Sequence, residues 1–106
     1  MQMKTNRERV NRGRVLNMES IEIVGPFDFN DASVDTLAGS ILNDGNQDIV
    51  LDLRKSLYLT SPGIACIIKV LKRVRTAGGA LYVHGATRDM IELLRLTKLG
   101  AFIHFV

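Results

Sequence analysis

Short apolar runs alternate with segments of helical spacing along most of this chain, and this alternation restricts the fold more than any other feature. Residues 48–53 (DIVLDL) are rich in branched apolar side chains, as expected of a buried central strand. Residues 64–74 repeat apolar side chains at the spacing of one helix face, and residues 80–83 (ALYV) return to a strand pattern. Strands that alternate with helices indicate an α/β fold with a partly parallel sheet.

The segments before residue 48 are bounded by turn residues. The tripeptide 11–13 (NRG) is a turn signal, and it predicts short strands over 15–18 and 20–24, or one strand with an irregularity. The Gly25-Pro26 pair ends this strand. Apolar residues at i, i+3 and i+7 then predict a helix over 32–42, with a buried stripe of Val34, Leu37 and Ile41.

The longest predicted helix begins at the Ser61-Pro62 pair, because Ser is a favoured N-cap and Pro suits the first helical position. It ends at the glycine pair 78–79. Thr87 is expected to cap a shorter helix that runs to Leu96, and residues 102–106 read as a last strand. The core stripe of the long helix is predicted to be Ile64, Ile67, Ile68, Leu71 and Val74.

A chain of 106 residues corresponds to one domain, which we expect over residues 10–106. Residues 1–9 (MQMKTNRER) have many charges and no apolar period, so we interpret them as a mobile basic arm. The longest apolar run is five residues, Ile64 to Ile68, which predicts no membrane span. A lone Cys66 excludes an intramolecular disulfide and agrees with a cytoplasmic location.

Charge is strongly segregated along the chain. Residues 1–14 carry a net charge of +4, residues 15–53 carry −8 with no Lys or Arg, and residues 54–106 carry +7. A basic half is compatible with nucleic acid. However, the chain has no Trp and no aromatic residues interleaved with Arg or Lys, so we predict no direct nucleic-acid binding.

Motifs for catalysis or cofactor binding are weak. His84 and His104 lie twenty residues apart without clustered acids, which favours surface histidines over a metal site. No Gly-x-Ser-x-Gly elbow surrounds Ser61, and the glycines form no nucleotide-binding loop. Cys66 falls within an apolar helix and is expected to be a packed thiol. We therefore expect no catalytic residue, no metal and no cofactor.

Several short segments, in order and at the right spacing, resemble the STAS domain, the fold of bacterial anti-sigma factor antagonists. The main one is the strand 49–53 (IVLDL) followed by 57–64 (LYLTSPGI). Residues 25–28 (GPFD), 78–81 (GGAL) and 94–99 (LRLTKL) resemble three further family segments. The resemblance extends from Arg14 to Val106. It implies a single α/β domain with a mixed sheet of four or five strands and about three helices packed mainly on one face.

The resemblance also implies a non-enzymatic switch. The family residue that a partner kinase phosphorylates corresponds to Ser61, with Thr60 as a second candidate. The unphosphorylated family member binds that partner, an anti-sigma factor that is also a kinase, and so frees the sigma factor. This sequence departs from the family pattern at Thr60, where the family has Asp, and at Pro62, where it has Ser or Thr.

The predicted partner surface combines the phosphoacceptor with neighbouring residues. At about 100° per residue, Ser61, Ala65, Lys69 and Lys72 fall on one outward strip of the long helix. In STAS domains the loop that carries the Asp28 position lies near the phosphoacceptor. The partner-binding set is therefore Asp28, Thr60, Ser61, Ala65, Lys69 and Lys72. The simpler interpretation is that Ser61 is an ordinary N-cap and that the two lysines lie on a solvated helix face.

Three functional hypotheses remain open at this point. The first is an anti-sigma factor antagonist whose partner is a serine kinase of the histidine-kinase-like ATPase type, with a PP2C-type phosphatase reversing the modification. The second is a STAS scaffold subunit that binds its partner without phosphorylation. The third is a small nucleotide-binding or enzymatic α/β domain, which predicts a concave pocket with converging titratable groups. We expect a monomer or a weak dimer, and the sequence does not identify the sigma factor.

Overall fold

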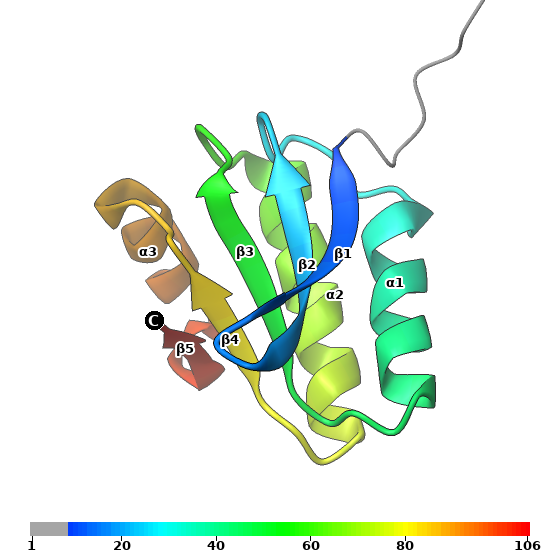
Figure 1. Ribbon diagram of the computed structural model, residues 1–106. Helices are drawn as coiled ribbons and strands as arrows, with labels where there is room; N and C mark the ends of the chain where they lie inside the picture. The colour runs from blue at the N-terminus through cyan, green and yellow to red at the C-terminus, as the bar shows by residue number, and fades with distance from the viewer. Residues whose placement is uncertain (1–8) are drawn as a thin grey trace, which may run out of the picture.

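A five-stranded mixed sheet lies at the centre of the computed structural model, which describes residues 9–106 (Figure 1). The strand order in the sheet follows the order along the chain. The first two strands are antiparallel, and every later neighbour is parallel. The α/β prediction is confirmed, with five strands: β1 (Val10–Val15), β2 (Met18–Val24), β3 (Ile49–Lys55), β4 (Leu81–His84) and β5 (Ile103–Phe105).

The helices connect the parallel strands and lie mainly on one face of the sheet. They are α1 (Ala32–Asn43), α2 (Ser61–Thr76) and α3 (Arg88–Arg95). Right-handed crossovers between strands that advance in one direction place all their helices on the same side. Figure 1 shows α2 behind the sheet, α1 at the right next to β1 and α3 at the left next to β4. None of these helices is long and apolar enough to cross a membrane, within residues 9–106.

The core lies between the sheet and these helices. Alternate residues of β3, Ile49, Leu51 and Leu53, point into it, and so do Ile21 and Ile23 of β2. The buried side of α2 is rotated slightly from the predicted stripe, because Cys66 and Val70 are fully buried while Ile64 and Ile68 pack at its margin. The buried residues of the two long helices are Val34, Ala38 and Ile41 in α1 and Gly63, Cys66, Ile67, Val70, Leu71 and Val74 in α2.

The predicted position of the turn near the N-terminal strands is wrong. Residues 11–13 belong to β1, and Val15 pairs with Met18 across a two-residue turn at Leu16 and Asn17. Both turn residues have a left-handed backbone, with φ of 56° and 62°. Two-residue hairpins need this conformation and usually carry Asn-Gly there. Leu at the first turn position gives no such signal, whereas the NRG tripeptide within the strand gives a false one.

The C-terminal elements agree with the prediction except at their ends. Thr87 caps α3, since its side chain accepts a hydrogen bond from the Met90 backbone N–H. The helix ends at Arg95, and Leu96 is 83% exposed. A short 3₁₀ helix, η2 (Gly100–Phe102), precedes β5, which is therefore shorter than the predicted strand over 102–106.

The predicted basic arm falls mostly outside the described part of the chain, because residues 1–8 are not described. Arg9, the last residue of that predicted arm, contacts the folded domain. Its guanidinium lies 4.1 Å from the centre of the Phe29 ring and 3.3 Å from a carboxylate oxygen of Asp31.

Candidate functional site

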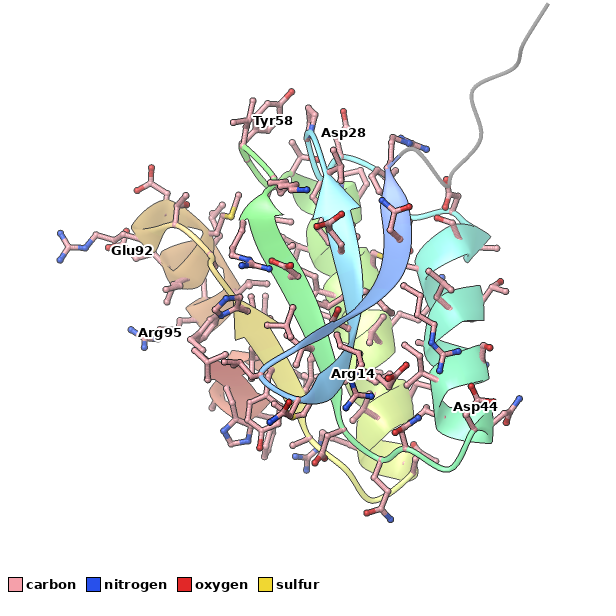
Figure 2. All side chains as sticks on the ribbon, in the orientation of Figure 1. Arg14, Asp28, Asp44, Tyr58, Glu92 and Arg95 are labelled. Carbon is pink, nitrogen blue, oxygen red and sulfur yellow. The ribbon has the colours of Figure 1, made fainter. Side chains whose placement is uncertain are left out.

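Two loops meet at the end of the sheet where β2 and β3 finish. The loop after β2 and the loop between β3 and α2 form a single parallel bridge between Phe27 and Leu59. The Phe27 N–H donates to the Tyr58 carbonyl at 2.9 Å, and the Thr60 N–H donates to the Phe27 carbonyl at 3.1 Å. Figure 2 shows Asp28 and Tyr58 at this same end of the molecule. The bridge therefore fixes the start of α2 against the residue that precedes Asp28.

Gly63 makes this close approach possible. A Cβ at residue 63 would overlap the Phe27 carbonyl oxygen and would also lie 2.8 Å from a Leu59 methyl carbon. Only a glycine lets the first turn of α2 sit directly on the loop after β2. As a result Asp28, an exposed residue, lies next to the N-terminus of α2.

Ser61 is exposed and is the first residue of α2, so it does not act as the predicted N-cap. Thr60 is the N-cap residue, with φ −116° and ψ 177°, but its hydroxyl makes no capping bond and is buried without a partner among the described residues. The shift by one residue is tolerated because Pro62 lacks only an N–H that the first turn of a helix leaves unused. The Ser61 hydroxyl likewise has no hydrogen-bond partner within residues 9–106.

The outward strip of α2 is present as predicted from the helical spacing. Ala65, Lys69 and Lys72 are all exposed, and the two lysines form no ion pair within residues 9–106. Cys66 lies beneath the strip and is buried. Burial raises the pKa of the Cys66 thiol to about 11, so the thiol is protonated and unreactive at neutral pH.

The charge segregation seen in the sequence is largely resolved by pairing inside the fold. Every ion pair within residues 9–106 joins an acidic side chain of the segment 15–53 to a basic side chain of one of the two flanking segments. By contrast, Asp28 has no ion pair within the described chain. Within residues 9–106 the pairs are Arg9–Asp31, Arg12–Glu19, Arg12–Asp44, Arg14–Glu19, Arg54–Asp52, Lys55–Glu22 and Arg73–Asp35.

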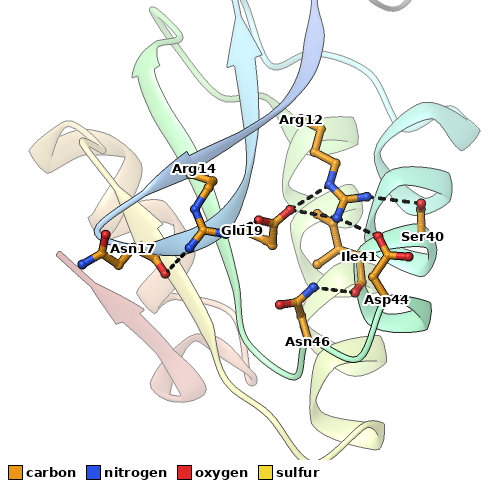
Figure 3. Close-up of polar contacts among 8 residues, drawn as sticks. All are labelled: Arg12, Arg14, Asn17, Glu19, Ser40, Ile41, Asp44 and Asn46. Carbon is orange, nitrogen blue, oxygen red and sulfur yellow. Dashed lines mark hydrogen bonds and ion pairs between the residues drawn. The ribbon is translucent and has the colours of Figure 1, made fainter.

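The opposite end of the sheet holds a dense polar network (Figure 3). The Arg12 guanidinium donates to Glu19 and Asp44 at 2.8 Å each, and Arg14 donates to the second Glu19 oxygen at 2.6 Å and to the Asn17 carbonyl. The hydrogen bond from Arg12 is the main reason that the pKa of Glu19 lies below its usual value. An open polar depression of about 380 Å³ adjoins this network, lined in part by Arg14, Glu19 and Asn46.

A second polar cluster lies on the sheet face opposite the helices. Arg54 donates from Nε and Nη2 to the two carboxylate oxygens of Asp52, at 3.0 and 2.8 Å, and this pairing lowers the pKa of Asp52. His84 is the strand neighbour of Asp52, and its Nδ1 is buried without a partner among the described residues. His104 is exposed and stacks 5.1 Å from the Tyr82 ring. Within residues 9–106, no three His, Cys, Asp or Glu side chains gather as a metal site would require.

An apolar depression beside Ser61 was not predicted from the sequence. It has a volume of about 340 Å³. Its lining is Leu57, Tyr58 and Leu59 of the β3–α2 loop, the N-cap residue Thr87, and Asp89, Met90 and Leu93 of α3. Leu57 is 78% exposed and Tyr58 is 51% exposed. Their apolar side chains in a loop were the only sequence signal for it, because the approach of α3 to this loop depends on the tertiary fold.

Comparisons with known proteins agree with this geometry. The family model described as "STAS domain" matches residues 14–106. The structure of the anti-sigma factor antagonist SpoIIAA in its unphosphorylated form superposes with a TM-score of 0.67 at 10% identity, over 92% of this chain and 86% of the other. The NMR structure of TM1081, from Thermotoga maritima, gives a TM-score of 0.61 at 17% identity, over 91% and 78% of the two chains. At these identities the structural likeness shows the fold alone. No curated protein sequence matches the chain significantly.

Proposed function

The chain belongs to the STAS domain family, and from that premise we propose that it is an anti-sigma factor antagonist controlled by phosphorylation of Ser61. In this role it is a non-catalytic cytoplasmic protein that acts as a monomer or a weak dimer. Its partner is an anti-sigma factor that is also a serine kinase of the histidine-kinase-like ATPase type. A PP2C-type phosphatase reverses the modification.

The observation that carries the proposal is the position of Ser61. Its hydroxyl is exposed at the N-terminus of a sixteen-residue helix and has no hydrogen-bond partner within residues 9–106. Modification of this hydroxyl therefore breaks no contact that holds the fold together. Thr60 is the weaker acceptor, because its hydroxyl is buried.

Physical chemistry explains why a phosphate at Ser61 would act as a switch. The free N–H groups and the positive dipole end of α2 tolerate an anion at this position. A phosphate adds roughly −1.5 to −2 charges at pH 7. Those charges would lie between Asp28, which is already negative, and the exposed Lys69 and Lys72 of the same helix. Phosphorylation of Ser61 therefore makes the charge of the partner-binding surface more negative while α2 stays folded.

A scaffold role without phosphorylation is the second candidate. Thr60 stands where the family has Asp, so the carboxylate beside the acceptor is replaced by a buried hydroxyl. Pro62 removes one backbone N–H from the first turn of α2. Both departures alter the environment that a kinase would read, and they favour a subunit that binds its partner permanently.

The test is a binding series with the cognate anti-sigma factor kinase. Ser61→Asp is expected to weaken binding by at least about tenfold, equivalent to about 1.4 kcal/mol. Ser61→Ala should bind as tightly as the wild type, and Thr36→Asp, at an exposed site on α1, controls for the added charge. Mass spectrometry after incubation with the kinase and Mg-ATP should find phosphate on Ser61. Full binding by Ser61→Asp together with an absence of phosphate on Ser61 and Thr60 would favour the scaffold role.

A further inference from the structure

The apolar depression beside Ser61 has the form of a site for a side chain of another protein. We propose that it receives one large apolar side chain of the partner, with a Lys or Arg next to that residue in the partner's sequence. The identity of the partner rests on the proposed function, but the chemistry of the site rests on the depression itself.

The size and lining of the depression favour a single apolar side chain. Its volume of about 340 Å³ is at the lower end of the roughly 300–1,000 Å³ found for ligand pockets, which is small for a cofactor. Met90 and Leu59 are almost fully buried and form its floor, at 1% and 6% exposure. Leu57, Tyr58 and Leu93 are large apolar residues that remain exposed around it. Buried apolar pockets surrounded by such residues are typical positions for the central anchor of an interface.

The charge around the depression determines which residue should stand next to the apolar residue in the partner's sequence. Asp89 lines the depression, is exposed, and has no ion pair within the described chain. Its sequence neighbour Arg88 does not line the depression. Asp28 lies at the same end of the molecule as Tyr58 and also has no ion pair within the described chain (Figure 2). A cationic partner residue complements the Asp89 carboxylate at the depression, and an acidic one is repelled by it.

The depression and Ser61 share one short loop. Leu57, Tyr58 and Leu59 form its wall, and Thr60 and Ser61 follow directly in sequence. A partner that contacts the Ser61 hydroxyl therefore touches a residue only two positions from Leu59, which lines the depression. The anchor supplies affinity by burying apolar surface, and this contribution does not itself depend on the charge at Ser61.

Selection of peptides from a phage-displayed library of short random sequences tests this inference without the natural partner. Selected peptides should share an apolar residue next to Lys or Arg. Leu93→Glu should weaken their binding by at least about tenfold in fluorescence anisotropy. Leu96→Glu, at the C-cap of α3 and outside the depression, should leave binding unchanged. Asp89→Lys should redirect selection toward an apolar residue next to Asp or Glu.

Each outcome decides the inference. Failure to enrich any shared motif, enrichment of acidic neighbours on the wild type, or binding that survives Leu93→Glu in a folded variant would each overturn it. Circular dichroism of every variant confirms folding. The peptide selection does not depend on phosphorylation, so a failed kinase assay on Ser61 with a successful selection rejects the switch and keeps the anchor site. A successful kinase assay on Ser61 with a failed peptide selection rejects the anchor site and keeps the switch.

Discussion

The two ends of the parallel sheet differ in how completely their polar groups are paired. At the hairpin end, near the start of β2, Arg12 contacts Glu19, Ser40 and Asp44, and Arg14 contacts Glu19 as well (Figure 3). At the Ser61 end the ion pairs Arg9–Asp31 and Lys55–Glu22 form, but other polar groups of the described chain stay unpaired. The hydroxyls of Ser56 and Thr60 are buried without a partner, and the Asp28 carboxylate and the Ser61 hydroxyl have none either, within residues 9–106.

We expect this difference to separate stability from binding, because the proposed partner surface lies at the Ser61 end. Buried polar groups in folded proteins are almost always hydrogen-bonded, so unpaired ones require an explanation. The hairpin end follows the general rule and serves the fold. The Ser61 end departs from it in the same place where large apolar residues, Leu57 and Tyr58, are left exposed. Departures of both kinds at one place are expected of a surface that a partner completes.

The largest expected effect is a loss of stability when the close contact between Gly63 and the Phe27 carbonyl is disrupted. Gly63→Ala should lower the free energy of unfolding by about 3 kcal/mol, because the new methyl group overlaps the Phe27 carbonyl and must force α2 away from the loop. Urea unfolding measures the change. Gly45→Ala is the matched control: its φ of +93° strains the alanine, but no atom lies within 4 Å of the added Cβ, so a loss of about 1 kcal/mol is expected. Equal losses in the two variants would contradict the close approach.

The contribution of the hairpin end to stability should depend on pH, and a substitution there should leave partner binding unchanged. The pKa of Glu19 is lowered from its ordinary value of 4.5, mainly by the hydrogen bond from Arg12. A lowered acid pKa contributes stability that is fully present above pH 4.5 and is lost as the pH falls through the folded-state value. Glu19→Gln should therefore be less stable than the wild type at pH 7, and the gap should close in acid. A gap that stays constant down to acid pH, or a loss of partner binding, would contradict this assignment.

The smallest expected effect compares the two threonine N-caps. Thr87 accepts a hydrogen bond from the Met90 N–H, so Thr87→Val should cost about 1 kcal/mol of stability. The Thr60 hydroxyl has no partner among the described residues, so Thr60→Val removes nothing that stabilises the fold and should be neutral or slightly stabilising. Thermal unfolding of the two variants measures both. A loss at Thr60 as large as that at Thr87 would show that the Thr60 hydroxyl is paired in solution.

The elements with strong local signals were predictable from the sequence. The apolar run 48–53, the glycine stop at 78–79 and the Thr87 cap each fix an element through local chemistry, and all three are confirmed. The turn at Leu16–Asn17 was missed, because Leu16 does not favour the left-handed backbone that it adopts there and Asn17 alone is a weak turn signal.

Local chemistry was less informative about the candidate site. The pattern Ser61-Pro62 predicted the start of α2 to within one residue and its exposed strip. It gave no indication that Gly63 rests on the Phe27 carbonyl, or that α3 comes close enough to the loop to enclose a depression. Both depend on contacts between segments far apart in sequence, which periodicity does not encode.

Amide chemical-shift mapping tests most directly whether the Ser61 end is the binding surface. The isotope-labelled protein would be titrated with the cognate anti-sigma factor kinase in the absence of ATP. The account predicts shift changes or broadening at Asp28, Ser61 and Lys69, with the hairpin residues Leu16 and Asn17 unaffected. Perturbations centred on the hairpin turn, with the Ser61 amide unchanged at saturation, would contradict it.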